Sequence, residues 1–390
     1  MELFTAEFTQ TLPLLGMFIV CLFLSHFLLK PIKVLSESAL KRTSPLDGLR
    51  GILALSVLVH HFYITYMWKT GIGWIPPSID YLNNLGTMSV SFFFLITAFL
   101  FLSKINDNAK QQTTNNKQQT TNNKQQTTIN WKILFKSRFK RILPMYFFIV
   151  MAITIITVNI IPTESYNKSQ LFHFLQRWLL FQGTDLAGFH AGFIISHVQW
   201  TLIYEWGFYF SLPAIYVLWQ QRKAPIILVI TTIFIAYFCI HNTVSHMYWL
   251  FALALPSVVL KEPLKLFVEK YNKYLHPVML LIFIYTFFYT KGYSAEQMIC
   301  TASLFSFISN GYSFGGILNT MGLRKLGEIS FSLYLSHGIF LYLFFSILNI
   351  YDFNTNNFSE YMHYFPFVFF ISVASSLITY KLIERPFLAK

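Results

Sequence analysis

Long apolar runs recur along this chain and constrain its fold more than any other feature. A helix that crosses a bilayer needs about 20 mainly apolar residues and must satisfy its backbone groups internally. Eleven segments approach that length: 12–30, 48–67, 85–103, 142–161, 197–219, 225–241, 246–260, 276–290, 297–318, 329–349 and 364–383. Hydrophobic residues make up 55% of the chain and charged residues 12%, which is typical of integral membrane proteins. We predict an all-α protein, a polytopic bundle of about 10 to 11 transmembrane helices.

The basic residues are distributed unevenly between the predicted loops. If the N-terminus is outside, all but four of the 29 lysines and arginines lie on the cytoplasmic side; the four are Lys69, Lys168, Arg177 and Lys291. Cytoplasmic loops of membrane proteins carry such an excess. This distribution predicts an outside N-terminus and a cytoplasmic C-terminus. It also explains the net charge of +13 without a nucleic-acid partner, and leaves the lipid bilayer as the surrounding partner.

A seven-residue repeat, "NNKQQTT", fills much of the segment 104–130. The repeat has no apolar positions, so it cannot form a packed core or a coiled coil. We predict a disordered cytoplasmic loop there. The three cysteines, Cys21, Cys239 and Cys300, are far apart in sequence and show no spacing of metal ligands. We interpret them as buried core residues and predict no metal site.

The stretch "DGLRGILALSVLVHHF", residues 47–62, carries ionisable residues along an apolar helix. Arg50 and His61 are eleven residues apart, which puts them about 16 Å apart along the axis and within about 20° of one face. His60 is rotated about 100° from that face, whereas Asp47 lies close to it. Such a stripe usually faces a wet cavity and is functional, although an arginine at the interface and a structural histidine are the alternative. The pattern favours His61 over His60.

Four further segments accompany this stripe: "SRFKRILPMYF" (137–147), "WTLIYEWGFYFSLP" (200–213), "LGEISFSLYLSHG" (326–338) and "LIERPF" (382–387). With "LDGLRG" at 46–51 they resemble, in the same order, the motifs of the membrane acyltransferase-3 family. Its members transfer acyl groups, usually acetyl, to sugars of cell-surface polysaccharides. The resemblance implies an acyltransferase-3 type membrane domain at 46–387. An additional transmembrane helix and a cytoplasmic linker would precede it at 1–45.

Two departures from the family pattern stand out. Thr97-Ala98 occupies the place of a Ser-Gly pair, and Trp206 replaces the second of two adjacent glutamates. These differences motivate one alternative, a catalytically silent relative that acts as a scaffold.

The resemblance implies an O-acyltransferase in the bacterial cytoplasmic (inner) membrane. It would move an acetyl group from cytoplasmic acetyl-CoA, with no permanently bound cofactor, to a sugar hydroxyl of a surface polysaccharide such as lipopolysaccharide O-antigen or of a lipid-linked glycan. His61 would be the base or a transient acyl carrier, because a neutral imidazole accepts a proton near neutral pH. Glu205 would be the second catalytic residue, which orients His61 or accepts the hydroxyl proton.

The remaining candidate residues divide into two groups. Arg50, Arg138 and Arg141 are predicted to bind the phosphates of coenzyme A, because guanidinium groups pair well with phosphate. A second set is predicted to line the same cavity: Asp47, Tyr209, Tyr334 and His337.

Several alternatives stay open at the level of sequence. In one alternative the chemistry is the same, but the acceptor is peptidoglycan, an exopolysaccharide or a lipid. A transporter or flippase is a different class, although the sequence shows neither an internal repeat nor paired Gly/Pro-broken helices. The aromatic residues of the loop 162–196 suit either sugar stacking or a membrane interface. We interpret that loop as interfacial.

Overall fold

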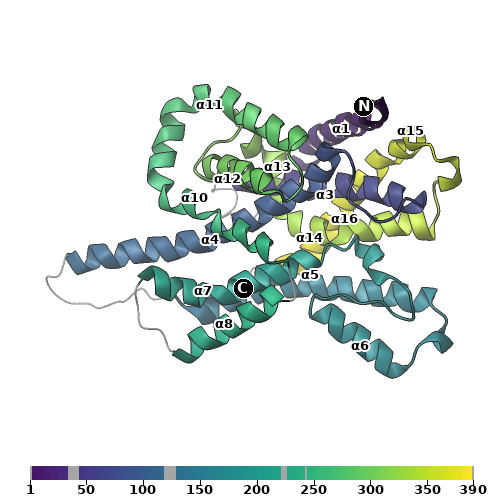
Figure 1. Cartoon of the computed structure of the whole chain (residues 1–390), viewed down its shortest axis with the longest axis horizontal. Coiled ribbons are helices and arrows are strands. Elements are labelled where there is room, and N and C mark those ends of the chain that lie inside the picture. The colour runs from purple at the N-terminus through teal and green to yellow at the C-terminus, as the bar shows by residue number, and fades with distance from the viewer. Residues whose placement is uncertain (1, 34–43, 118–128, 221–225, 242–243, 389–390) are drawn as a thin grey trace.

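The computed structural model describes residues 2–33, 44–117, 129–220, 226–241 and 244–388, and nearly all of them lie in helices (Figure 1). The long helices are α1 (Glu2–Leu29), α3 (Pro45–Lys69), α4 (Asp80–Lys117), α5 (Trp131–Ile160), α6 (Lys168–Leu179), α7 (Trp200–Gln220), α8 (Ile226–His241), α11 (Lys261–Tyr289), α12 (Ala295–Ser309), α14 (Ser330–Tyr342) and α16 (Phe365–Thr379). The short ones are α9 (Trp249–Ala252), α10 (Leu255–Val259), α13 (Met321–Glu328), α15 (Phe358–Tyr361) and α17 (Arg385–Leu388). These described residues include no β-strand, which confirms the predicted all-α bundle.

Six helical segments within the described ranges are long and apolar enough to cross a membrane. They are Thr9–Leu29, Pro45–Lys69, Asp80–Asp107, Trp131–Ile160, Ser330–Ile347 and Phe358–Leu388. Several other predicted spans are also helical, but they are shorter or interrupted. The segment 246–260 is divided among short helices, α12 has only 15 residues, and α11 bends at Tyr271. The chain is therefore a multi-pass membrane protein, and the orientation of its termini stays a prediction.

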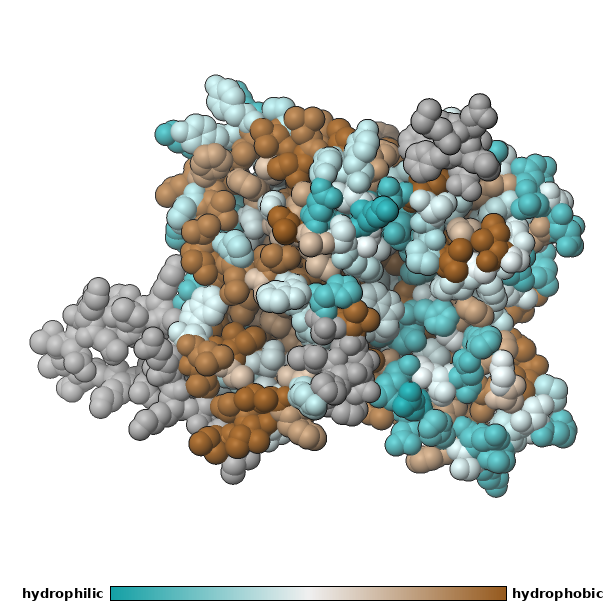
Figure 2. Space-filling model, viewed as in Figure 1, coloured by the Kyte–Doolittle hydropathy of each residue, from teal (hydrophilic) through white to brown (hydrophobic). Residues whose placement is uncertain are grey.

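Apolar side chains gather on the outer surface over α8 and α11 (Figure 2). On α8, Ile226, Ile230 and Phe234 are more than half exposed, and on α11 Leu266 and Leu281 are as well. Exposed apolar area of this kind is unfavourable in water and suits contact with lipid chains. Figure 2 shows hydrophilic side chains over α6 and α15 instead.

The prediction of a disordered loop from residue 104 onward is wrong for its first part. Helix α4 continues without a break through Lys117, and its last part contains no Gly or Pro that would end it. Ile105 is buried, and Asn106 donates a hydrogen bond to the Val258 carbonyl oxygen at 3.5 Å. Residues 118–128 of the predicted loop lie outside the described residues.

Helix α3 lies in the middle of the bundle and packs against α4, α13 and α14 (Figure 1). Its contact with α13 is a direct approach of two backbones. A methyl carbon built on Gly51 would lie 2.7 Å from the Leu323 carbonyl oxygen, and one built on Gly327 would lie 1.7 Å from the Asp47 carbonyl oxygen. Small residues allow such close helix packing in membranes. Since Asp47 and Arg50 lie in the same turns, this contact also fixes the start of the ionisable stripe.

Helix α1, which precedes the motif-bearing region, packs against the same α13. The Lys325 amine donates hydrogen bonds to the carbonyl oxygens of Leu29 at 2.9 Å and Lys30 at 2.6 Å, at the carboxyl end of α1. A cation at that end also interacts favourably with the helix dipole. Gly322 leaves room for His26, because a methyl carbon on residue 322 would lie 2.4 Å from the Cα atom of His26. The N-terminal helix is therefore docked on the bundle.

Gly327→Ala is expected to destabilise the protein, because the added methyl group has no space between α13 and the backbone of Asp47. Overpacking of this kind typically costs about 1–3 kcal/mol, and backbone atoms yield less readily than side chains. The thermal unfolding midpoint in detergent measures the effect. Gly16→Ala is the matched control, since no atom lies within 4 Å of its built carbon. Equal midpoints for the two variants would contradict the close-packing argument.

Candidate active site

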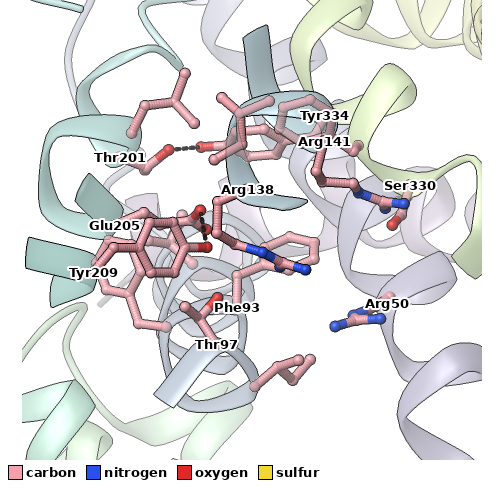
Figure 3. A pocket seen from close by; sticks show the side chains of 16 residues that line it. Arg50, Phe93, Thr97, Arg138, Arg141, Thr201, Glu205, Tyr209, Ser330 and Tyr334 are labelled. Atoms are coloured by element: carbon pink, nitrogen blue, oxygen red, sulfur yellow. Dashed lines mark hydrogen bonds between the residues drawn. The ribbon is translucent and has the colours of Figure 1, made fainter. Parts of the chain in front are cut away.

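A cavity of about 100 Å³, here the arginine cavity, lies between α3, α4, α5, α7 and α14. Its lining residues are Arg50, Val90, Phe93, Phe94, Ile96, Thr97, Arg138, Arg141, Ile142, Thr201, Leu202, Glu205, Tyr209, Ser330, Phe331 and Tyr334. Figure 3 shows the guanidinium groups of Arg50, Arg138 and Arg141 on one side, facing Glu205 and Tyr209 on the other. The structure thus brings together the three arginines that the sequence singled out.

Each arginine is held by a neighbouring group. Arg138 and Arg141 are one turn apart on α5. The guanidinium carbon of Arg138 lies 5.1 Å from the centre of the Phe101 ring, and that of Arg141 lies 5.9 Å from the Phe331 ring. Arg50 forms an ion pair with Asp47 at 3.9 Å. Asp47 therefore positions Arg50 and is absent from the described cavity lining, contrary to the prediction.

Glu205 lies in the arginine cavity, with the Tyr209 hydroxyl donating to its Oε2 at 3.1 Å. Thr201, Glu205 and Tyr209 succeed one another at four-residue intervals, so they form one stripe on α7. The positive charges of Arg138, Arg50 and Arg141 all act on the Glu205 carboxylate. The expectation that Glu205 orients His61 is wrong, because the imidazole of His61 lines a different cavity.

That second cavity, here the histidine cavity, has a volume of about 220 Å³. Its lining residues are Val57, His60, His61, Ile64, Trp74, Ile75, Pro76, Asn83, Gly86, Thr87, Val90, Ser196, His197, Val198, Trp200, Tyr293 and Tyr334. His61 Nδ1 lies 3.0 Å from His337 Nε2, and the two rings stack with centroids 5.1 Å apart. His337 itself is fully buried behind His61, so it supports the wall rather than lining it as predicted.

The hydrogen bonds assign the tautomers of this histidine pair. His337 Nδ1 lies 3.2 Å from the Leu333 carbonyl oxygen, which only accepts, so this nitrogen carries the proton. In a neutral His337 the Nε2 atom is then an acceptor, and His61 Nδ1–H donates to it. The Nε2 atom of a neutral His61 is left with a free lone pair. An imidazole held in this way has the arrangement of a general base.

His60 is tied to the neighbouring helix. Its Nδ1 lies 2.8 Å from the Leu82 carbonyl oxygen, and its ring fills the space left by Gly86 of α4. The helix-face argument placed His60 away from the stripe, yet the structure shows that it also reaches the cavity wall. The two histidines differ in their hydrogen bonds: His61 pairs with His337, whereas His60 bonds to the Leu82 carbonyl oxygen.

The two cavities are adjacent and share two lining residues, Val90 and Tyr334. The hydroxyl groups of Tyr334 and Thr201 are 3.0 Å apart and hydrogen-bonded (Figure 3). Tyr334 and His337 share a face of α14, as the sequence predicted from their three-residue spacing. One turn of α14 therefore supplies both the partition between the cavities and the partner of His61.

Other polar groups near the site tie helices together. The Ser332 hydroxyl donates to the Glu384 carboxylate, which joins α14 to the π turn Tyr380–Glu384. Arg141 also acts electrostatically on Glu384. Across the described ranges, no three His, Cys, Asp or Glu side chains converge in the way a metal site requires.

Sequence reasoning missed most of the histidine cavity, including the three loop residues Trp74, Ser196 and His197. They come from loops, where no helical periodicity marks an inward face. Ser196 and His197 both have positive φ angles, of 54° and 56°, which nothing in their residue types indicates.

The fold and the paired cavities define a class of protein. A membrane bundle in which an arginine-lined cavity lies beside a histidine-lined cavity is suited to group transfer within the bilayer. The family model described as an acyltransferase domain, of the acyltransferase-3 family, matches residues 43–381. The chain therefore belongs to this family and is a membrane acyltransferase. Searches of curated proteins and of solved structures give no match.

Proposed function

We propose that the protein transfers an acetyl group from acetyl-CoA to a sugar hydroxyl of a cell-surface polysaccharide, such as lipopolysaccharide O-antigen, in the bacterial inner membrane. One observation carries this proposal: the arginine cavity and the histidine cavity are adjacent and share the lining residues Val90 and Tyr334. A donor with several phosphates at one end and a thioester at the end of a long arm fits two such cavities in series. The chemistry then takes place beside His61.

The arginine cavity is suited to the nucleotide end of coenzyme A. Arg50, Arg138 and Arg141 direct their guanidinium groups to one side of it (Figure 3). Guanidinium groups form charge-assisted hydrogen bonds to phosphate oxygens, often in pairs. The excess of basic residues in the loops on the predicted cytoplasmic side supports an opening toward the compartment that holds acetyl-CoA. Glu205 and Tyr209, on the opposite side, balance the arginine charges and orient Arg138.

The histidine cavity is suited to the transfer step. The Nε2 lone pair of His61 takes the proton of the sugar hydroxyl as its oxygen attacks the thioester carbonyl carbon. The carbon–sulfur bond then breaks, the acetyl group stays on the sugar oxygen, and the coenzyme A thiolate takes the proton back from the imidazolium. His337 holds His61 in the required tautomer through the 3.0 Å contact between their nitrogens.

His61→Ala is expected to lower acetyl transfer roughly 10²- to 10⁴-fold, the usual contribution of a general base. His337→Ala is expected to cost less, roughly 10- to 100-fold, as orienting partners of functional histidines do. His60→Asn keeps a donor for the Leu82 carbonyl oxygen and should retain most of the activity. Each variant is expressed, at equal membrane abundance, in a strain that lacks this gene. Proton NMR then measures the ester-linked acetate on the purified surface polysaccharide.

Unchanged acetate in the His61→Ala strain would remove this residue from the chemistry. Release of free coenzyme A from acetyl-CoA by the purified protein, dependent on His61, separates the enzyme from a transporter or a silent scaffold. A protein that never cleaves acetyl-CoA yet supports acetylation in cells would contradict the proposed role.

Arg138→Ala is expected to raise the KM for acetyl-CoA roughly 10- to 100-fold, the equivalent of one lost charge-assisted hydrogen bond. The KM of Arg138→Lys should lie between those of Arg138→Ala and the wild type. A lysine keeps the positive charge, but its ammonium group lacks the planar fork of guanidinium. Lys136→Ala is the matched control, since Lys136 lies on the same helix but is exposed outside the cavity. Steady-state release of coenzyme A measures the KM, and equal values for Arg138→Ala and Lys136→Ala would sink the phosphate-binding role.

A further inference from the structure

The outer wall of the histidine cavity is aromatic. The Trp74 ring lies nearly parallel to the His61 ring, with centroids 6.1 Å apart and planes 21° apart. Trp74 is fixed by three further rings, with centroids at 5.3 Å for Phe193, 5.6 Å for His197 and 5.7 Å for Trp68. A large, immobilised indole next to a candidate base offers a flat apolar surface for a ligand ring.

The adjoining wall is a strained turn. Ser196 and His197 are consecutive residues in the left-handed region, with φ angles of 54° and 56°. Non-glycine residues rarely adopt this conformation, and it persists only where the surroundings enforce it, often at ligand sites. Here the enforcing contact is visible: the His197 ring packs on Gly192, where an added methyl carbon would lie 2.2 Å from Cε1. The turn holds both side chains in the cavity wall.

Ser196 also carries an unused hydrogen-bonding group. Its side chain is 2% exposed and lines the histidine cavity, and its Oγ has no hydrogen-bond partner among the described residues. A buried hydroxyl without a partner is unfavourable and calls for an explanation. A ligand that brings hydroxyl groups of its own into the cavity would supply the missing partner.

The cavity also differs from its neighbour in charge. No Lys, Arg, Asp or Glu is among the described residues that line it, whereas the arginine cavity holds three arginines and a glutamate. While the histidines of its lining, His60, His61 and His197, are neutral, a ligand carboxylate or phosphate placed here has no opposite charge to pair with, which is costly away from water. The polar groups on offer are neutral ones, from residues such as Ser196, Asn83 and Tyr293.

We propose that the histidine cavity is the acceptor subsite and takes a single uncharged pyranose ring. One face of the ring stacks on Trp74, a rim hydroxyl bonds to Ser196, and His197 lies alongside. This places another hydroxyl at the Nε2 atom of His61. The proposal rests on the proposed function and adds to it the class of acceptor: a neutral sugar unit rather than a uronic acid, a phosphosugar or an alkyl alcohol.

The test uses the purified full-length protein in detergent, with acetyl-CoA as donor and three methyl glycosides as acceptors. Two are neutral, methyl α-D-glucopyranoside and methyl α-D-galactopyranoside, and one is the charged methyl α-D-glucopyranosiduronic acid. Acetyl ester formation and coenzyme A release are measured separately. Trp74→Ala is expected to raise the KM for a neutral glycoside at least 10-fold and to leave the KM for acetyl-CoA unchanged. Trp74→Phe should restore most of the affinity, and Trp249→Ala, an exposed tryptophan outside the cavity, should have no effect.

Ser196→Gly provides a second variant, and this change is not expected to impair folding. Glycine adopts positive φ readily, so the change removes the hydroxyl while easing the turn. It is expected to raise the glycoside KM several-fold with an unchanged or higher thermal midpoint. Unchanged glycoside KM values in both Trp74→Ala and Ser196→Gly would overturn the subsite.

The remaining outcomes separate this inference from the proposed function. Wild-type protein that does not cleave acetyl-CoA under any condition would refute the proposed function itself. Cleavage that no glycoside accelerates would overturn the one-ring subsite and leave the transferase in place. Acetylation of the uronic acid as fast as of the neutral glycosides would refute the preference for an uncharged ring.

Discussion

The close approach of α3 to α13 at Gly51 and Gly327 determines the geometry of everything around it. Within a bilayer, helices gain little from hydrophobic burial against one another, so intimate backbone packing has to provide the association. Helix α3 carries Arg50 at one end and His61 about 16 Å further along its axis. Helix α13 leads directly into α14, which carries the partition and the partner of His61. One contact therefore sets the register between the end of α3 that carries Arg50 and the end that carries His61.

The separation of charge follows from this register. Three arginines and a glutamate are gathered in one cavity, and the described lining of the other contains no Lys, Arg, Asp or Glu. Charges at membrane depth are expensive unless they are paired or face water, so a single polar cavity for them is economical. Tyr334 lies between the two cavities with its hydroxyl hydrogen-bonded to Thr201. A reacting carbonyl beyond this tyrosine would experience few fixed charges, and the positions of neutral donors and acceptors would then govern its reactivity.

The sequence predicts those features that a single helix determines. Arg50 and His61 share α3, so their spacing alone places them on one face, and the same holds for Tyr334 and His337 on α14. The position of Glu205 relative to His61 depends on how separate helices pack, which no spacing reveals. The loop residues are hidden for another reason: Trp74 reaches the cavity through a turn, and the backbone of Ser196 is stabilised by tertiary contacts. The extension of α4 to Lys117 shows that polar repeats without Gly or Pro can continue a helix that packing has begun.

The hydrogen-bond chain behind His61 explains why Glu205 is not needed beside it. A base of this kind requires a group that fixes its tautomer, and in water-exposed sites a carboxylate often has that role. Here His337 has it, and the tautomer of His337 is fixed in turn by the Leu333 carbonyl oxygen of its own helix. A backbone carbonyl oxygen adds no net charge, so the arrangement avoids the desolvation penalty of a buried carboxylate. His61 is thus oriented through its contact with α14, and the carboxylate of Glu205 remains among the arginines of the other cavity.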